Sequence, residues 1–186
     1  MQNLLPAGLL DNNVEFFVDA DLQAYKLKNG TRIAFDDFDN ETMDVIRRNM
    51  WQYPEKVAEL MLMGITNTHE MLRQYLICNY GGFDNKADMV DGQLQESEYW
   101  PCPKRGQCPH EGRLCDNLRT DTGEVLTRRE IEVLKVVAKG KLDKEIADQL
   151  FISLGTVTTH TKNIRAKTGL YRKVDLARFA TQKNLI

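Results

Sequence analysis

The sequence has no apolar run close to the roughly 20 consecutive residues that a membrane-spanning helix needs. Its first residues, MQNLLPAGLLDNN, lack the basic segment and the long apolar core of a secretory signal peptide. Low-complexity tracts are also absent, and 42% of the 186 residues are hydrophobic, as in ordinary globular proteins. We therefore expect a folded cytoplasmic protein without a membrane partner.

The sequence also lacks the short motifs of common catalytic sites. It contains no nucleophile elbow, no phosphate-binding glycine loop and no H-E-x-x-H zinc motif. Five residues separate Cys102 from Cys108, whereas only two separate the paired cysteines of a zinc deaminase. We therefore expect no enzymatic activity.

The net charge of −2 does not favour an anionic partner, but it is the sum of two different parts. Residues 121–186 carry 13 basic and 8 acidic side chains, a net charge of +5. Residues 1–120 carry 12 basic and 19 acidic side chains, a net charge of −7. Such asymmetry indicates that one part meets an anion and the other has a different task, although charge alone leaves a chance fluctuation open.

Residues 1–120 are expected to form an α+β domain. Strands are predicted over 14–35, with Asn29-Gly30 as a hairpin turn because both residues tolerate positive φ. Three helices are predicted next, over residues 40–51, 55–63 and about 66–80. The expected helix starts are Asn40 or Thr42, then Pro54, then Thr66 or Thr68. Residues 81–123 show little periodicity.

Residues 121–186 are predicted to form four short helices. Thr127 and Glu130 have the spacing of a capping box at the start of the first helix. Ser153 is expected to cap the third helix, which Gly169 ends. The second and third helices are joined by about three or four residues, the spacing of a helix-turn-helix.

The segment LTRREIEVLKVVAKGKLDKEIADQLFISLGTVTTHTKNIRAKTGL resembles the LuxR/FixJ-type helix-turn-helix family of bacterial transcription regulators. The matching elements are Leu126-Thr127-x-Arg129-Glu130-x-Glu132-Val133-Leu134, Gly140, Lys144-Glu145-Ile146-Ala147, Leu150, Ile152-Ser153, Thr156-Val157, His160, Asn163-Ile164, Lys167 and Gly169-Leu170. The resemblance covers about the last 60 residues of the chain, and it implies a DNA-binding domain.

The resemblance implies that the third helix enters the major groove of double-stranded DNA, where polar side chains in its N-terminal half reach base edges. Lys162 matches a position that commonly contacts DNA in relatives, whereas Thr158 stands where they often have a basic residue. Lys144 lies at the start of the second helix and is expected to meet a phosphate. The expected DNA-binding residues are Lys144, Thr156, Thr158, Thr159, Lys162, Asn163 and Arg165. Lys167 is expected either to contact the DNA backbone or to be structural.

Two further expectations come from comparison with the family pattern. Relatives usually have an apolar residue and a small hydroxyl cap where this sequence has Lys141-Leu142, so Asp143 is expected to cap the second helix. The fourth helix forms a dimer contact in relatives. Here Leu176, Phe179 and Ala180 would either form a homodimer contact or belong to the core.

All four cysteines, Cys78, Cys102, Cys108 and Cys115, lie in the acidic part with the spacing C-x23-C-x5-C-x6-C. Disulfides are uncommon in the cytosol, so clustered thiols beside Pro and Gly more often bind a metal. Four thiolates suit a tetrahedral zinc site, which would constrain the aperiodic segment. An iron–sulfur cluster and ordinary reduced thiols are the alternatives, and His110 could replace one cysteine.

These patterns predict a mainly α protein with a small N-terminal β-hairpin, an acidic domain over 1–120 and a four-helix domain over 121–186. The predicted function is a sequence-specific DNA-binding transcription regulator with a zinc-stabilised N-terminal domain. The alternatives are a helix-turn-helix domain that docks a protein, an iron–sulfur redox-sensing regulator, and a metalloenzyme tethered to DNA.

Overall fold

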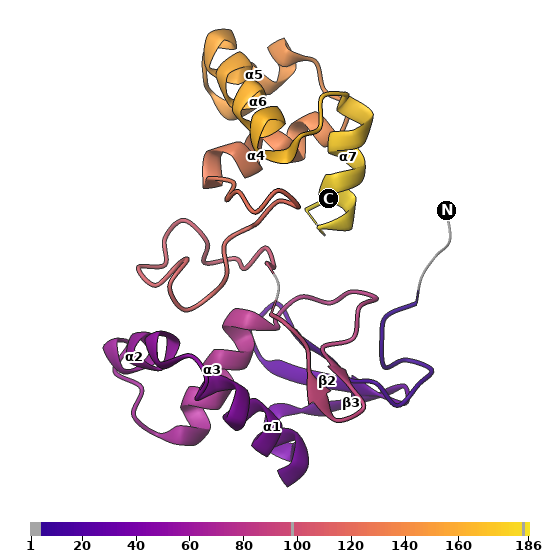
Figure 1. The fold of residues 1–186 in the computed structure, drawn as a ribbon, viewed down its shortest axis with the longest axis vertical. Helices are drawn as coiled ribbons and strands as arrows, with labels where there is room; N and C mark the ends of the chain where they lie inside the picture. Colours follow the sequence, from indigo (N-terminus) through magenta and orange to yellow (C-terminus); the bar gives the residue numbers. More distant parts are fainter. Residues whose placement is uncertain (1–4, 98, 184) are drawn as a thin grey trace. The chain divides into compact units, whose positions relative to one another are not determined.

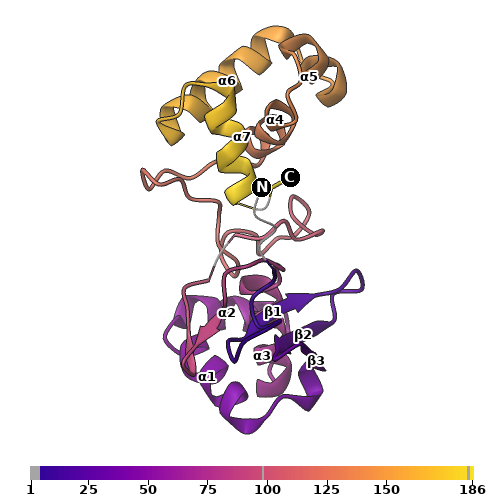
Figure 2. The ribbon, with the colours of Figure 1, turned by 90° about the vertical axis from the view of Figure 1, so that its right-hand side faces the viewer.

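A computed structural model of the chain describes residues 5–97, 99–183 and 185–186. The chain divides into two compact units, Met1–Asp116 and Asn117–Ile186 (Figures 1 and 2). Helices dominate both units, and the strands lie in the first, so the expected mixed α+β fold is confirmed. Within the described residues, no helix is long and apolar enough to cross a membrane.

The N-terminal unit begins with an antiparallel sheet in the order β1-β2-β3. Its strands are β1 (Glu15–Val18), β2 (Ala24–Lys28) and β3 (Thr31–Ala34). Asn29 and Gly30 join β2 to β3 with φ values of 49° and 72°. These positive values are those of a type I′ hairpin turn, so the predicted turn is confirmed.

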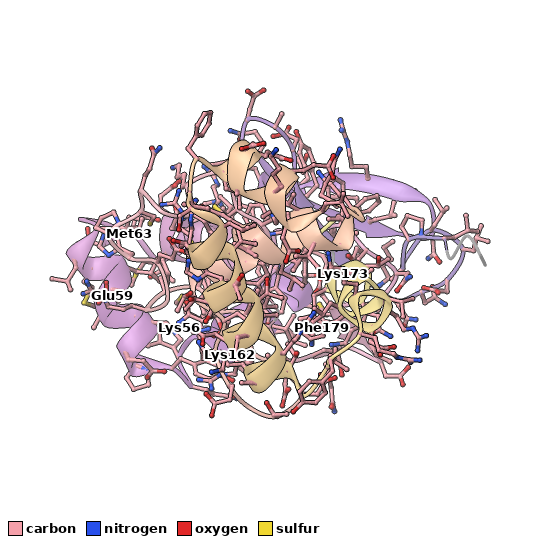
Figure 3. All side chains as sticks on the ribbon, turned by 90° about the horizontal axis from the view of Figure 1, so that it is seen from above. Lys56, Glu59, Met63, Lys162, Lys173 and Phe179 are labelled. Carbon is pink, nitrogen blue, oxygen red and sulfur yellow. The ribbon has the colours of Figure 1, made fainter. Side chains whose placement is uncertain are left out.

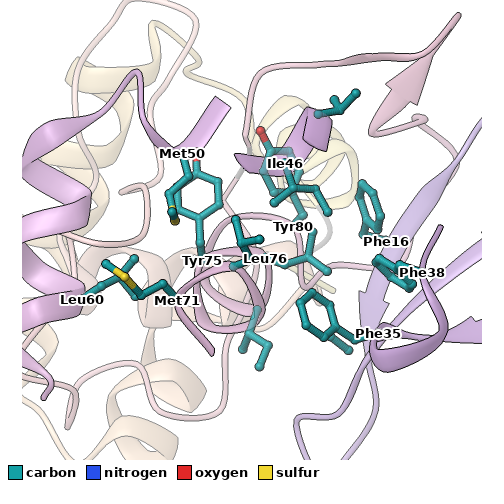
Figure 4. Close-up of a cluster of buried hydrophobic side chains, with 14 of the residues drawn as sticks. Phe16, Phe35, Phe38, Ile46, Met50, Leu60, Met71, Tyr75, Leu76 and Tyr80 are labelled. Atoms are coloured by element: carbon teal, nitrogen blue, oxygen red, sulfur yellow. The ribbon is translucent and has the colours of Figure 1, made fainter. Parts of the chain in front are cut away.

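The 3-10 turn η1 (Phe35–Asp37) leads from the sheet into three helices, α1 (Asn40–Met50), α2 (Pro54–Leu62) and α3 (Thr68–Asn79). All three predicted helices are therefore present. Side chains from the sheet and the helices share one buried apolar cluster (Figure 4). Phe16, Ile46, Met50, Leu60 and Leu72 are fully buried in it.

The predicted caps of α1 and α3 were wrong. Asp39 caps α1, because its carboxylate accepts the Thr42 backbone N–H at 2.8 Å. The same carboxylate pairs with the buried Lys26 ammonium, a partner on β2 that local sequence does not reveal. Asn67 caps α3, and its side-chain oxygen accepts the backbone N–H groups of His69 and Glu70.

A second small hairpin, β4 (Met89–Val90) with β5 (Gln93–Leu94), was not predicted. Asp91 and Gly92 form its turn with φ values of 50° and 73°. Asp-Gly is a hairpin signal, but the flanking strands have two residues each and give no detectable alternation.

The C-terminal unit contains four helices, α4 (Arg128–Ala138), α5 (Asp143–Leu150), α6 (Leu154–Thr168) and α7 (Lys173–Gln182). The predicted capping box of Thr127 and Glu130 and the Ser153 cap are confirmed. Gly169 ends α6 with a φ of 69°, as expected of a C-terminal glycine. The predicted Asp143 cap was wrong. The Glu145 carboxylate instead accepts the Leu142 backbone N–H at 2.7 Å.

Helix α7 packs along α4 through its apolar face. Leu176, Phe179 and Ala180 are at most 3% exposed. These three side chains therefore belong to the core of the unit, which was one of the two expectations for them, and the homodimer contact through this helix stays a prediction.

Candidate nucleic-acid interface

Helix α6 has one buried face and one exposed face. Val157, Thr161, Ile164 and Thr168 recur at helical spacing and are buried. The opposite face consists of polar side chains, which begin one turn after the Ser153 cap. Thr158, Thr159, Lys162 and Asn163 are exposed, and Thr156 and Arg165 are half-buried at its margins. The predicted α6 residues therefore lie along one side of a single helix.

The hydroxyl groups at the start of α6 already donate their hydrogens within the helix. Thr158 Oγ1 donates to the Leu154 carbonyl at 3.0 Å, and Thr159 Oγ1 donates to the Gly155 carbonyl at 3.0 Å. The Thr156 and Ser153 hydroxyls lie 2.8 Å apart at the cap. The Thr158 and Thr159 oxygens keep a free lone pair and can accept a hydrogen bond from an outside donor.

Most basic side chains of this unit are neutralised by nearby carboxylates. Arg128 and Arg129 pair with Glu132, and Lys173 pairs with Asp143. Among the described residues, no ion pair engages Lys144, Lys162 or Arg165, although all three lie on or beside the helix-turn-helix. Figure 3 labels Lys162 on α6. These positive charges remain available to an external anion.

A shallow hollow of about 400 Å³ lies beside this charged face of α6. Its lining includes Thr161, Lys162, Arg165 and the exposed Tyr171. Arg165 Nε and Thr161 Oγ1 are buried there, and neither has a hydrogen-bond partner among the residues that the structure describes. The hollow is therefore lined by polar and basic side chains of α6.

Lys167 has a structural role, which was one of the two expectations for it. Its ammonium donates to Glu130 Oε2 at 2.8 Å and to the Val125 carbonyl at 3.0 Å. Glu130 is buried and also accepts the Thr127 backbone N–H at 2.8 Å. Burial raises the pKa of the Glu130 carboxyl, and the hydrogen bonds from Lys167 and Thr127 lower it. The lowering is the larger effect, so the pKa of Glu130 lies below its ordinary value.

The α6 surface lies within a segment, residues 124–180, that matches the family described as bacterial regulatory proteins, luxR family. Residues 124–180 form a LuxR-family domain. The family resemblance predicted from the sequence is thereby confirmed for the C-terminal unit.

Similar proteins support the same assignment for this part of the chain. The oxygen regulatory protein NreC from Staphylococcus aureus strains JH9, JH1 and Mu3 is in each case 43% identical over 67 residues. Those residues cover 36% of this chain and 31% of NreC. The chain thus spans about a third of the length of these relatives. The LuxR-family domain is the shared part.

The N-terminal unit contains the second predicted site. Cys78 lies on α3, and Cys102, Cys108 and Cys115 lie on residues 95–116, here named the cysteine loop. All four half-buried thiols line one cavity of about 280 Å³. Among the described residues, however, no three His, Cys, Asp or Glu side chains are grouped closely enough to hold one metal ion. The structure therefore brings the four cysteines to one cavity.

The cysteine loop is held against the helices by direct side-chain contacts. Lys56 Nζ on α2 lies 3.3 Å from Asp116 Oδ1 and 2.5 Å from Asn79 Oδ1. Glu59 Oε2 lies 2.7 Å from His110 Nδ1 (Figure 3 labels Lys56 and Glu59). Side-chain contacts therefore contribute to the constraint of this loop, and the predicted metal stays a prediction.

The environment of the thiols differs from that of free cysteine. Burial raises the pKa of the Cys78 thiol to about 12, although a 3.1 Å hydrogen bond from Gln74 Nε2 to its sulfur opposes the shift. Burial also raises the pKa of the Cys102 thiol, which the Lys104 backbone N–H partly offsets. The sequence analysis identified the four cysteines but missed these two donors, although both are local: Gln74 lies one helical turn before Cys78, and Lys104 lies two residues after Cys102.

Proposed function

We propose that this chain is a sequence-specific DNA-binding regulator of transcription, and that α6 reads the major groove of double-stranded DNA. The observation that carries the proposal is the α6 face itself. It combines hydroxyl, amide and unpaired basic side chains on one exposed side of the recognition helix in a LuxR-family domain. The proposal places the chain in the cytoplasm, where bacterial DNA is found.

The side chains of this face divide into two roles. Thr158, Thr159 and Asn163 carry the groups that distinguish bases, because an amide pairs with adenine and a hydroxyl accepts from base amino groups. Lys144, Lys162 and Arg165 carry charge to the phosphates, which sets affinity and register.

The proposal extends to the N-terminal unit in one respect. Its four cysteines hold a metal centre of thiolate ligands, for which zinc and an iron–sulfur cluster are the two candidates. The unit is acidic and has the role of sensing a signal or binding a partner.

A second candidate function, docking of a protein partner on the helix-turn-helix, is favoured by one observation. Phe151, in the turn before α6, is 95% exposed, and Leu154 beside it is 54% exposed. Large apolar side chains at such exposure are typical of protein interfaces. Salt dependence separates the two functions, because phosphate contacts release counterions and apolar contacts do not.

The test is the affinity of the full chain for a mixed-sequence DNA duplex, measured over a series of salt concentrations. We expect affinity to fall steeply with salt, and Lys162→Ala to lower the slope of log affinity against log salt by about 0.9. Lys144→Ala should act in the same direction.

Lys139→Ala is the matched control. It removes the same charge from an exposed position at the end of α4, outside the helix-turn-helix, and should leave the slope unchanged. An affinity that does not depend on salt, or a Lys139→Ala effect equal to that of Lys162→Ala, would contradict the proposed DNA contact and favour protein docking.

A further inference from the structure

The first turn of α6 exposes an apolar residue that the proposed DNA contacts do not include. Leu154 is the first residue of the helix, and it is 54% exposed. Leu154, Thr158 and Lys162 lie four residues apart, so their side chains follow one ridge along the helix, and all three are exposed. Leu154 therefore extends the proposed DNA-binding face by one turn toward the N-terminus of α6.

The end of α6 that carries Leu154 is held in one orientation. The Ser153 hydroxyl caps the helix and accepts the Thr156 backbone N–H at 3.1 Å. Val157, in the same turn, is fully buried. Recognition helices contact base edges through their N-terminal residues. Under the proposed function, Leu154 and the residue one turn later, Thr158, are thus the side chains of this ridge that meet the bases.

The two threonines of this face expose methyl groups. Thr158 Oγ1 donates to the Leu154 carbonyl and Thr159 Oγ1 donates to the Gly155 carbonyl, both at 3.0 Å. These bonds turn each hydroxyl back toward the helix backbone and use its one proton. Because Cβ is tetrahedral, the Cγ2 methyl group lies on another side of each exposed side chain. The first two turns of α6 therefore present apolar carbons.

The major groove offers one apolar partner for these carbons. Among the groups on base edges there, only the C5 methyl group of thymine is apolar. A leucine side chain has no hydrogen-bond donor or acceptor, so it can distinguish bases only through apolar contact.

The charges of α6 favour DNA as the occupant of this apolar surface. Residues 154–168 contain no Asp or Glu, so no carboxylate of the helix repels the phosphates that flank the groove. Lys162 lies one turn beyond Thr158, and no ion pair engages it within the described parts of the chain. An apolar tip followed by an available positive charge matches a base methyl group followed by a phosphate.

We infer that Leu154 and the methyl groups of Thr158 and Thr159 read thymine, by contact with its C5 methyl group in the major groove. Leu154 thereby becomes a specificity-determining residue, and the bound DNA site contains thymine opposite the first two turns of α6. The inference rests on the proposed function, because it requires α6 to enter the groove.

The test compares thymine with uracil, which differ only in this methyl group. The full chain selects a duplex from a random pool, and the thymines of the selected motif are then replaced by deoxyuridine. The affinities for the two duplexes are measured at one salt concentration. We expect the unsubstituted chain to lose about fourfold in affinity for each contacted methyl group, the effect of burying one methylene-sized group.

Substitutions on the ridge identify which atoms make the contact. Leu154→Ala should bind the thymine duplex more weakly and lose less affinity when uracil replaces thymine. Thr158→Ser keeps the hydroxyl and removes the methyl group, so it should also lose less, whereas Thr158→Val keeps the methyl group and should lose as much as the unsubstituted chain. Val174→Ala is the matched control. It shortens an apolar side chain that is 59% exposed on α7 and should leave the thymine-to-uracil ratio unchanged.

The outcomes separate this inference from the proposed function. A chain that selects a motif without thymine, or that binds both duplexes equally, overturns the inference and keeps the proposed function. An equal loss on uracil in the unsubstituted chain, Leu154→Ala and Thr158→Ser would assign the effect to DNA shape and also overturn it. A chain that selects no motif overturns both and favours protein docking at Leu154. Circular dichroism of each variant confirms that the helices are retained.

Discussion

Lys162 and Lys167 lie five residues apart on α6 and have different surroundings. Among the described residues no ion pair engages Lys162, whereas Lys167 contacts the buried Glu130 and the Val125 carbonyl. A charge that the protein itself neutralises contributes to stability, and a charge left open to solvent is available to a ligand. At the scale of the residue, this difference separates the proposed DNA contacts from the structural lysine.

Lys167→Met should destabilise the C-terminal unit by about 3 kcal/mol, because it leaves the Glu130 carboxylate buried without its charged partner. Urea unfolding followed by circular dichroism measures the change. Arg128→Ala breaks the exposed pair with Glu132 and should cost less than about 1 kcal/mol. Equal costs for the two substitutions would show that the Glu130–Lys167 pair is not effectively buried.

The same pair predicts a dependence of stability on pH. The pKa of Glu130 is lower in the folded chain than its ordinary value of 4.5, so its contribution to stability is complete above about pH 4.5. That contribution is lost as the pH falls through the lower, folded-state pKa. Unfolding free energies between pH 7 and pH 3 should therefore fall more steeply in the unsubstituted chain than in Glu130→Gln. Parallel curves would contradict the assignment.

The helices of the C-terminal unit begin and end at residues that can be recognised locally. Ser153 and the Thr127–Glu130 box start two of them, and Gly169 ends α6 with a positive φ. Because a β-carbon is strained at this φ, the glycine is a structural requirement at the scale of the element.

Gly169→Ala should therefore destabilise the unit by about 1 kcal/mol. Gly155→Ala should instead increase the stability of the unit. Gly155 lies inside α6, its added Cβ would meet only Ser153 Oγ at 3.7 Å, and alanine should stabilise the helix by up to about 1 kcal/mol. Thermal unfolding of both variants checks the two signs. A stabilising Gly169→Ala would show that α6 does not end there.

Much of the fold was predictable from the sequence, because turn residues, helix caps and helical spacing are local patterns. The hairpin turn at Asn29-Gly30, the three N-terminal helices and the four C-terminal helices follow from turn residues, caps and helical spacing. The cap of α1 was missed although its signal is local, because Asp39 is a favoured N-cap residue and accepts the backbone N–H of Thr42 three residues later. The strands of β4 and β5 were too short to show a pattern.

The candidate sites were predictable only where they depend on local patterns in the sequence. Helical spacing places Thr158, Lys162 and Arg165 on one side of α6, as the sequence indicated. Which lysines are paired depends on contacts between helices, and Lys167 was therefore ambiguous. The cysteine count pointed to a metal, but the position of all four cysteines around one cavity comes only from the fold of the N-terminal unit.

At the scale of the whole molecule, charge is unevenly distributed. Residues 121–186 carry a net charge of +5 and residues 1–120 a net charge of −7. Residues 121–186 should therefore attract the DNA phosphates, and residues 1–120 should repel them. We expect this repulsion to weaken the binding of the full chain to DNA of arbitrary sequence.

The isolated residues 117–186 should accordingly bind a random-sequence duplex more tightly than the full chain does. Fluorescence anisotropy at low salt measures the difference, which should shrink as salt screens the acidic unit. If the fragment and the full chain bind with equal affinity at low salt, the acidic unit does not restrain binding.

The central claim is that α6 reads a DNA sequence. Selection of bound duplexes from a random pool by the full chain tests it most directly, with the Thr158→Ala, Thr159→Ala, Asn163→Ala triple variant as the comparison. We predict that one motif is enriched by the unsubstituted chain and that its enrichment falls in the variant, whose basic side chains still hold phosphate. A pool that stays random, or a motif that the variant enriches equally, would contradict the claim.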